Sequence, residues 1–188
     1  MEVTSIKLKG KESKYYLSPK FLNLRKVTVN VDTFACNGIF PKVKELHIKT
    51  KTQLYPEIFI QFPNVENLSI KCADETVDLQ YISKLEKTLR HLQIKSKSVV
   101  NTEGLNSLSQ LETFRFSIQE CARKEVPVEG CRYSLREVLS FTSRALRYVC
   151  IEGAAMVSIV VMVPKSCMDG KYCFNAESIG GKVRFQFY

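Results

Sequence analysis

The sequence has no tryptophan and no apolar stretch long enough to cross a bilayer. A membrane-spanning helix needs about 20 apolar residues, whereas the longest apolar run here covers only residues 154–164. We therefore expect no membrane span and interpret this run as one buried strand. Signs of disorder are missing too, because 45% of the residues are hydrophobic and 25% are charged, as in ordinary folded domains.

Motifs of common enzyme classes are also missing. The chain contains no Gly-x-Gly-x-x-Gly, P-loop, Gly-x-Ser-x-Gly or His-Glu-x-x-His sequence. Its only two histidines, His47 and His91, lie in separate segments without obvious ligand partners. We therefore expect no catalytic activity, no metal site and no cofactor.

Paired cysteines at metal-binding spacing are absent as well. The seven cysteines are Cys36, Cys72, Cys121, Cys131, Cys150, Cys167 and Cys173. An odd, scattered set argues against a zinc knuckle or a complete disulfide framework. Such thiols behave as small buried hydrophobes in a reducing compartment, so we expect an intracellular protein, cytoplasmic or nuclear. The alternative is a secreted repeat protein stapled by Cys121/Cys131 and Cys167/Cys173, although no signal peptide begins at Met1.

Two ten-residue segments share one pattern. Residues 40–49 and 62–71 each begin with Phe-Pro, continue as apolar-x-x-apolar-x-apolar, and end on lysine. This alternation predicts a strand of about five residues with one buried face. The equivalent valines, Val43 and Val65, are 22 positions apart, a period typical of repeat proteins.

The same pattern occurs seven times along the chain. Its first apolar residue is, in order, Val3, Leu24, Val43, Val65, Leu89, Leu111 and Leu146. Successive spacings are 21, 19, 22, 24, 22 and 35 residues, so only the last step contains an insertion. We predict a stack of adjacent parallel strands, because one repeat cannot bury its apolar face alone.

These repeats resemble the leucine-rich repeat superfamily over residues 3–152. They are most similar to the irregular intracellular repeats of F-box proteins, in which a Phe-Pro-x-Val or Leu-x-x-Leu step introduces each strand. The resemblance implies an α/β solenoid with a parallel sheet on its concave face. It also implies non-enzymatic protein–protein recognition, in the manner of an adaptor or substrate receptor, although no F-box precedes the first repeat.

One family feature is missing. The Asn or Cys that usually follows each strand is replaced by Lys11, Asp32, Lys51, Ala73, Lys97 and Gln119. The turns must therefore satisfy their backbone groups through other contacts.

We expect one compact domain with two parts. Residues 1–152 form the solenoid of about seven turns, with short helical or irregular returns. Residues 153–188 form a β-rich C-terminal cap, with strands expected at 156–163 and 183–187. No such cap precedes Val3, so that end is expected either to dock on a partner or to follow a missing upstream segment.

The segments between strands are expected to return behind the sheet. A helix is predicted over residues 76–87, and helical or irregular segments over 16–24, 55–62 and 105–111. Within the long last step, residues 120–132 are interpreted as a polar loop, and 134–143 as a short helix.

Alternate residues of the predicted strands face away from the core. Across seven strands this face has 21 positions, of which seven are basic and two acidic, in a chain of net charge +9. The candidate partner-binding residues on it are Lys7, Lys9, Lys26, His47, Lys49, Lys71, His91, Lys95, Arg115 and Tyr148. We predict that they bind a protein with an acidic surface.

Three of these lysines, Lys49, Lys71 and Lys95, occupy the same position on neighbouring strands, about 4.8 Å apart. Their mutual repulsion, up to about 1 kcal/mol per pair, would be relieved by an acidic partner. Alternatively, the lysines only keep an open sheet face soluble and discourage edge pairing. A second candidate function is sequence-independent nucleic-acid binding through phosphates. Base stacking is not indicated, because Tyr148 is the only aromatic residue on the face.

Overall fold

The computed structural model describes most of the repeat region and several strands beyond it. The described residues are 3–18, 20–36, 38–51, 54–118, 138–140, 143, 145–152, 160–162, 175–179 and 182–186. The predicted polar loop at 120–132 lies outside them.

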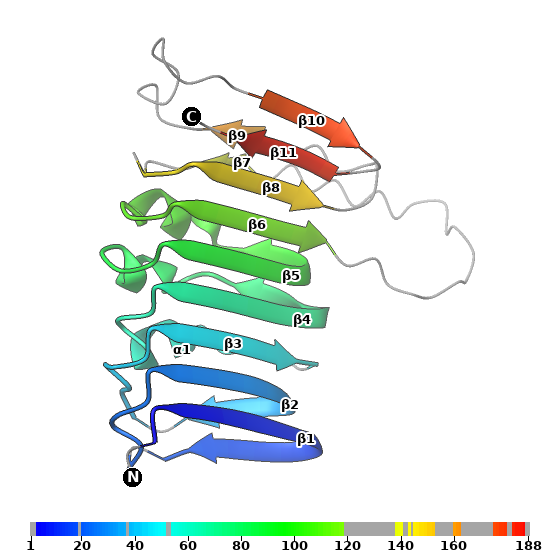
Figure 1. Cartoon of the computed structure of the whole chain (residues 1–188). Coiled ribbons are helices and arrows are strands. Elements are labelled where there is room, and N and C mark those ends of the chain that lie inside the picture. Colours follow the sequence, from blue (N-terminus) through cyan, green and yellow to red (C-terminus); the bar gives the residue numbers. More distant parts are fainter. Residues whose placement is uncertain are drawn as a thin grey trace, which may run out of the picture.

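Within the described residues, nine strands form one sheet, and its order follows the chain through the first seven members (Figure 1). These seven parallel strands are β1 (Ser5–Leu17), β2 (Lys26–Cys36), β3 (Glu45–Thr50), β4 (Asn67–Asp78), β5 (His91–Val100), β6 (Thr113–Ile118) and β8 (Tyr148–Glu152). Two further strands complete the sheet. β11 (Lys182–Gln186) pairs antiparallel with β8, and β10 (Asn175–Ile179) pairs antiparallel with β11. An α/β chain with a mostly parallel sheet is thus confirmed.

The repeat spacing places equivalent residues side by side. Leu46 of β3 pairs with Leu68 of β4, which in turn pairs with Leu92 of β5. The prediction that these three repeats form adjacent parallel strands is confirmed. Scattered positions in the sequence therefore become columns that run across the sheet.

A shared backbone contact begins each strand. The carbonyl of Lys44 accepts hydrogen bonds from two consecutive N–H groups of the next turn, Glu66 at 2.9 Å and Asn67 at 3.0 Å. Equivalent two-donor contacts occur at all six steps from β1 to β8. Because every turn enters the sheet through the same contact, each strand starts level with its neighbour although the repeat lengths differ.

The core lies between the sheet and the returning segments. The first apolar residue of each repeat after the first is at most 3% exposed; these residues are Leu24, Val43, Val65, Leu89, Leu111 and Leu146. Val3 is an exception to the predicted pattern, since 50% of it is exposed beside the edge strand β1. Phe40 and Phe62 stack in the core with ring centroids 5.2 Å apart. Burial of apolar surface, worth about 25 cal/mol per Å², thus joins consecutive turns.

Four of the described strands, β1, β2, β4 and β5, exceed the predicted length of about five residues, because they continue behind the front of the sheet. Figure 1 shows this most plainly for β1 and β2, whose ribbons bend round and return. In β4 and β5 the register shifts after Cys72, and pairing resumes where Thr76 lies opposite Ser98. The hydroxyl oxygens of Thr76 and Ser98 are 2.6 Å apart. A second parallel ladder therefore closes part of the back.

The predicted helix at 76–87 is wrong at its start for this reason. Val77 and Val99 are buried in the second ladder, where β-branched side chains pack well. Only a 3-10 helix, η1 (Ile82–Leu85), follows in the remainder of that segment.

The other predicted return segments have mixed outcomes. The helical return at 55–62 is confirmed by α1 (Ile58–Gln61). The return at 105–111 begins earlier than predicted, as the 3-10 helix η2 (Thr102–Ser107). The segment at 16–24 instead begins as strand, because β1 extends to Leu17.

Predictions beyond residue 120 are tested only in part. Within the predicted helix 134–143, the described strand β7 (Val138–Ser140) pairs with β9 (Val160–Met162), so the helix is wrong there. The remainder of that segment and of the predicted strand 156–163 falls largely outside the described residues. The predicted terminal strand is confirmed as β11.

Side chains a few residues ahead of the strands link consecutive turns. Each donates a hydrogen bond to a carbonyl of the preceding turn; the donors are Asn64, Thr88, Ser109 and Ser143. Ser143 is buried, and its hydroxyl lies 2.8 Å from the carbonyl oxygen of Leu111 and 2.9 Å from that of Ser109. These hydrogen bonds lie ahead of the strands, whereas the asparagine positions of the family resemblance follow the predicted strands, so the two sets concern different backbone groups.

Three cysteines within the described residues carry thiols and are buried: Cys36, Cys72 and Cys150. This agrees with their predicted behaviour as small hydrophobes. The thiol of Cys36 also hydrogen-bonds the side chain of Gln61, across adjacent turns. Burial raises the pKa of the Cys36 thiol from 9.0 to about 12, so this side chain is neutral at physiological pH.

The buried thiol predicts a loss of stability at alkaline pH. Its pKa is raised in the folded state, so its contribution is complete below pH 9 and is lost as the pH rises toward 12. Between pH 8 and 10 the free energy of unfolding should fall by about 1 kcal/mol more in the wild type than in Cys36→Ala. Urea denaturation at both pH values measures the difference. Equal losses in the two proteins would show that this thiol ionises as readily when folded as when unfolded.

Candidate binding face

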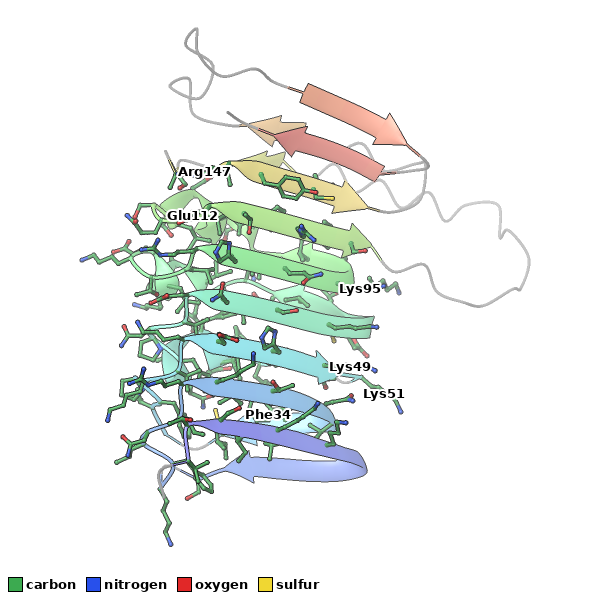
Figure 2. All side chains as sticks on the ribbon, in the orientation of Figure 1. Phe34, Lys49, Lys51, Lys95, Glu112 and Arg147 are labelled. Atoms are coloured by element: carbon green, nitrogen blue, oxygen red, sulfur yellow. The ribbon has the colours of Figure 1, made fainter. Side chains whose placement is uncertain are left out.

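The outward positions of β1–β6 and β8 form three columns across the sheet, and we call this surface the front face (Figure 2). The first column is Ser5, Lys26, Glu45, Asn67, His91, Thr113 and Tyr148. The middle column is Lys7, Thr28, His47, Ser69, Gln93, Arg115 and Cys150. The last column is Lys9, Asn30, Lys49, Lys71, Lys95, Ser117 and Glu152. Neighbours within each column are register partners, as predicted.

All ten candidate partner-binding residues belong to these columns, and none of them is buried. The more exposed ones are Lys7, Lys9, Lys26, Lys49 and Arg115. The half-buried ones are His47, Lys71, His91, Lys95 and Tyr148. A partner that covers the middle of the sheet would meet both groups.

Lys49, Lys71 and Lys95 lie directly opposite one another on β3, β4 and β5, and we call them the lysine column. Figure 2 shows Lys49 and Lys95 at the same edge of the sheet. The ion pairs within the described residues include none of the three. Three ammonium groups on strands about 4.8 Å apart raise one another's energy, so an anion placed among them would be stabilised.

Lys26 differs from the lysine column because its charge is compensated. Its Nζ lies 2.6 Å from Oε2 of Glu45 on the next strand. Nε2 of His47 is 3.7 Å from the same oxygen. The hydrogen bond from Lys26 is the main reason why the pKa of the Glu45 carboxyl lies below its usual value. The front face is therefore close to neutral at this point, although the sequence alone suggested a free cation.

A hollow of about 510 Å³ lies in the middle of the front face, and we call it the central hollow. It spans β3 to β6 and is lined by the first- and middle-column side chains of these four strands. Within its lining, Asn67 and Ser69 of β4 are shorter than the residues opposite them on β5, His91 and Gln93. Eight of its ten lining residues have polar side chains and the other two are Leu68 and Leu92, so a ligand there would meet hydrogen-bonding and charged groups beside apolar surface.

Two side chains that line the central hollow are held in place by their neighbours. The guanidinium carbon of Arg115 lies 5.2 Å from the centroid of the Tyr148 ring, a cation–π contact. Nδ1 of His91 lies 2.9 Å from the hydroxyl oxygen of Thr113. Side chains that are already ordered lose less entropy when they bind a ligand.

The predicted face is wrong at one position, Cys150. Its backbone is in register with Arg115 and Arg184, as the middle column requires. Its side chain is nevertheless only 1% exposed. The accessible part of the middle column therefore ends at Arg115, and Cys150 is unavailable to a partner.

Sequence reasoning missed a row of charges beside the front face. Residues that immediately precede the strands form ion pairs across the turns, Lys44 with Glu66 at 2.9 Å and Arg90 with Glu112 at 3.0 Å. Figure 2 places Glu112 and Arg147 at this edge, opposite the edge of the lysine column. The signal in the sequence was the alternation of sign among these residues. Opposite charges therefore compensate one another at this edge. The lysine column lies at the other edge and makes no ion pair among the described residues.

Two classes of site are not found within the described part of the chain. No group of three or more His, Cys, Asp and Glu side chains in it is arranged to hold a metal ion. No helix there has the length and apolar character required to cross a bilayer.

Comparison with known proteins assigns no relative to this fold or to the front face. No protein-family model, no curated protein and no solved structure matches the chain.

Proposed function

We propose that this protein is a non-enzymatic recognition module that binds an acidic segment of another protein through the front face. The lysine column is the observation that carries this proposal. Three register-paired lysines without ion pairs among the described residues form a linear array of positive charge. An extended acidic chain, which crosses the strands, would place carboxylates beside successive lysines.

The repeated architecture supports this role. We propose a leucine-rich-repeat-like solenoid of about seven turns that is closed by residues 153–188. Six parallel steps in chain order, each entered through the same backbone contact, support this assignment. A stack of this kind presents side chains from many turns on one rigid surface, which is how repeat proteins form extended binding faces. An adaptor or substrate-receptor role is consistent with such a surface.

The second candidate is sequence-independent binding of nucleic acid, because the same lysine column could pair with phosphates. One observation favours the protein partner. Tyr148 is the only aromatic residue among the front-face positions, and its ring already contacts Arg115, so the face offers no platform on which bases could stack.

A salt titration tests the two candidates against each other. The probes are a fluorescein-labelled peptide of ten glutamates and a labelled duplex DNA of similar length, measured by fluorescence anisotropy. We expect the peptide to bind more tightly than the duplex at physiological salt. Tighter binding of the duplex, with a log–log salt slope near −3 for three lysine–phosphate contacts, would overturn the protein-partner proposal and support the alternative.

A further inference from the structure

The central hollow has a direction, because one end has an arginine and the other a carboxylate that is already compensated. Arg115 lines it on β6, and Glu45 lines it on β3. Three strand spacings separate these two strands, which is about 14 Å. Glu45 is already paired with Lys26 at 2.6 Å, so the β6 end is the one where an anion is favoured.

The β6 end offers several hydrogen-bond donors close together. Gln93 is the register partner of Arg115, and His91 is the register partner of Thr113. These four residues thus form a square on two neighbouring strands. The contact between Nδ1 of His91 and Thr113 orients the imidazole and leaves Nε2 for a ligand. The Tyr148 ring orients the guanidinium of Arg115, whose planar fork matches two oxygens of an oxyanion.

We propose that the central hollow binds a phosphorylated side chain within the acidic segment, with its phosphate on Arg115 beside His91 and Gln93. This proposal rests on the function proposed above and names the group that the face distinguishes. A phosphate carries about −1.5 to −2 charges and three strong acceptor oxygens, whereas a carboxylate has one charge and two oxygens. The donors of the square exceed what one carboxylate can use.

The lysine column completes the geometry. Lys95 follows Gln93 by two residues on β5, so its Cα lies about 7 Å farther along the strand. A phosphate in the hollow and carboxylates on the lysine column can therefore come from neighbouring residues of one peptide. In this arrangement the column supplies affinity for any acidic segment, and the square supplies the preference for phosphate.

Matched peptides test the proposal. Three fluorescein-labelled peptides have the sequence Glu-Glu-Xaa-Glu-Glu, where Xaa is serine, glutamate or phosphoserine. The phosphoserine peptide should bind about tenfold more tightly than the glutamate peptide. Arg115→Gln should remove this preference, so that the phosphoserine and glutamate peptides bind the variant with affinities within about twofold of each other. Arg115→Lys, which keeps the charge without the planar fork, should lose most of the preference.

The control variant is Arg25→Gln, which removes an exposed arginine that precedes β2 and does not line the hollow. It should retain the full preference, and thermal unfolding verifies that every variant is folded. If the peptides bind but phosphoserine brings no advantage, or if Arg115→Gln keeps the advantage, the phosphate assignment is overturned and the proposed function stands. If none of the peptides binds, both proposals fail. Binding of duplex DNA that depends on Arg115 would assign the square to backbone phosphates and contradict the assignment to a peptide.

Discussion

Charge reversal of the lysine column should weaken binding of the ten-glutamate peptide by about 100-fold. The variant carries Lys49→Glu, Lys71→Glu and Lys95→Glu together. Each substitution replaces an attraction by a repulsion, worth about 1 kcal/mol at a solvated surface. Three such changes amount to about 3 kcal/mol, which corresponds to roughly two orders of magnitude in Kd. Fluorescence anisotropy at low and physiological salt measures the loss, which should shrink as salt rises.

The matched control separates the front face from net charge. Lys20→Glu, Lys84→Glu and Lys87→Glu together change the net charge of the chain by the same amount, and all three lysines are exposed outside the front-face columns. This triple variant should bind the peptide within a few-fold of the wild type. Equal losses in both triple variants would mean that only net charge acts. Unchanged binding in the front-face variant would remove the face from the proposed function.

Truncation of Phe62 should be among the most destabilising single changes in the chain. Phe62 is 1% exposed, and its ring stacks on Phe40 of the preceding turn at an interplanar angle of 17°. Phe62→Ala removes this contact and leaves a cavity, which together cost about 3–5 kcal/mol. For a domain of this size the thermal midpoint should fall by about 10 °C or more. Differential scanning calorimetry and urea denaturation measure the change.

Phe21→Ala is the control for this prediction. Phe21 lies three residues before Leu24, just as Phe62 lies three residues before Val65, but 37% of Phe21 is exposed. Its truncation should cost about 1 kcal/mol or less, because much of its surface is already in water. A loss below about 1 kcal/mol for Phe62→Ala would contradict a core in which consecutive turns pack through these rings.

The columns of the front face could be predicted because parallel pairing converts a sequence period into position. Once Leu46, Leu68 and Leu92 are buried in register, the residues between them must line up on the opposite side. The lysine column follows directly from this rule. The central hollow could not be predicted in the same way. Its shape depends on the relative sizes of the side chains that β3, β4, β5 and β6 place beside one another.

Other features depend on groups that are distant in the sequence. The segment after residue 76 has apolar spacing that suits a helix, yet Val77 pairs with Val99 on a second ladder, which local spacing does not reveal. The apolar–polar alternation of its strand places Cys150 at an outward position, yet its side chain is only 1% exposed. Which groups cover an outward position depends on tertiary packing, which the alternation does not reveal. The compensation of Lys26 by Glu45 also appears only when the two strands are side by side.

The sequence by itself determined the parallel strands, their register and the alignment of Lys49, Lys71 and Lys95, because these follow from a repeated apolar period. Only the tertiary structure decided which charges remain uncompensated, where the face is hollowed, and which outward positions are covered. These properties depend on distances between side chains of different turns, and burial changes the solvation of each group according to all of its neighbours at once.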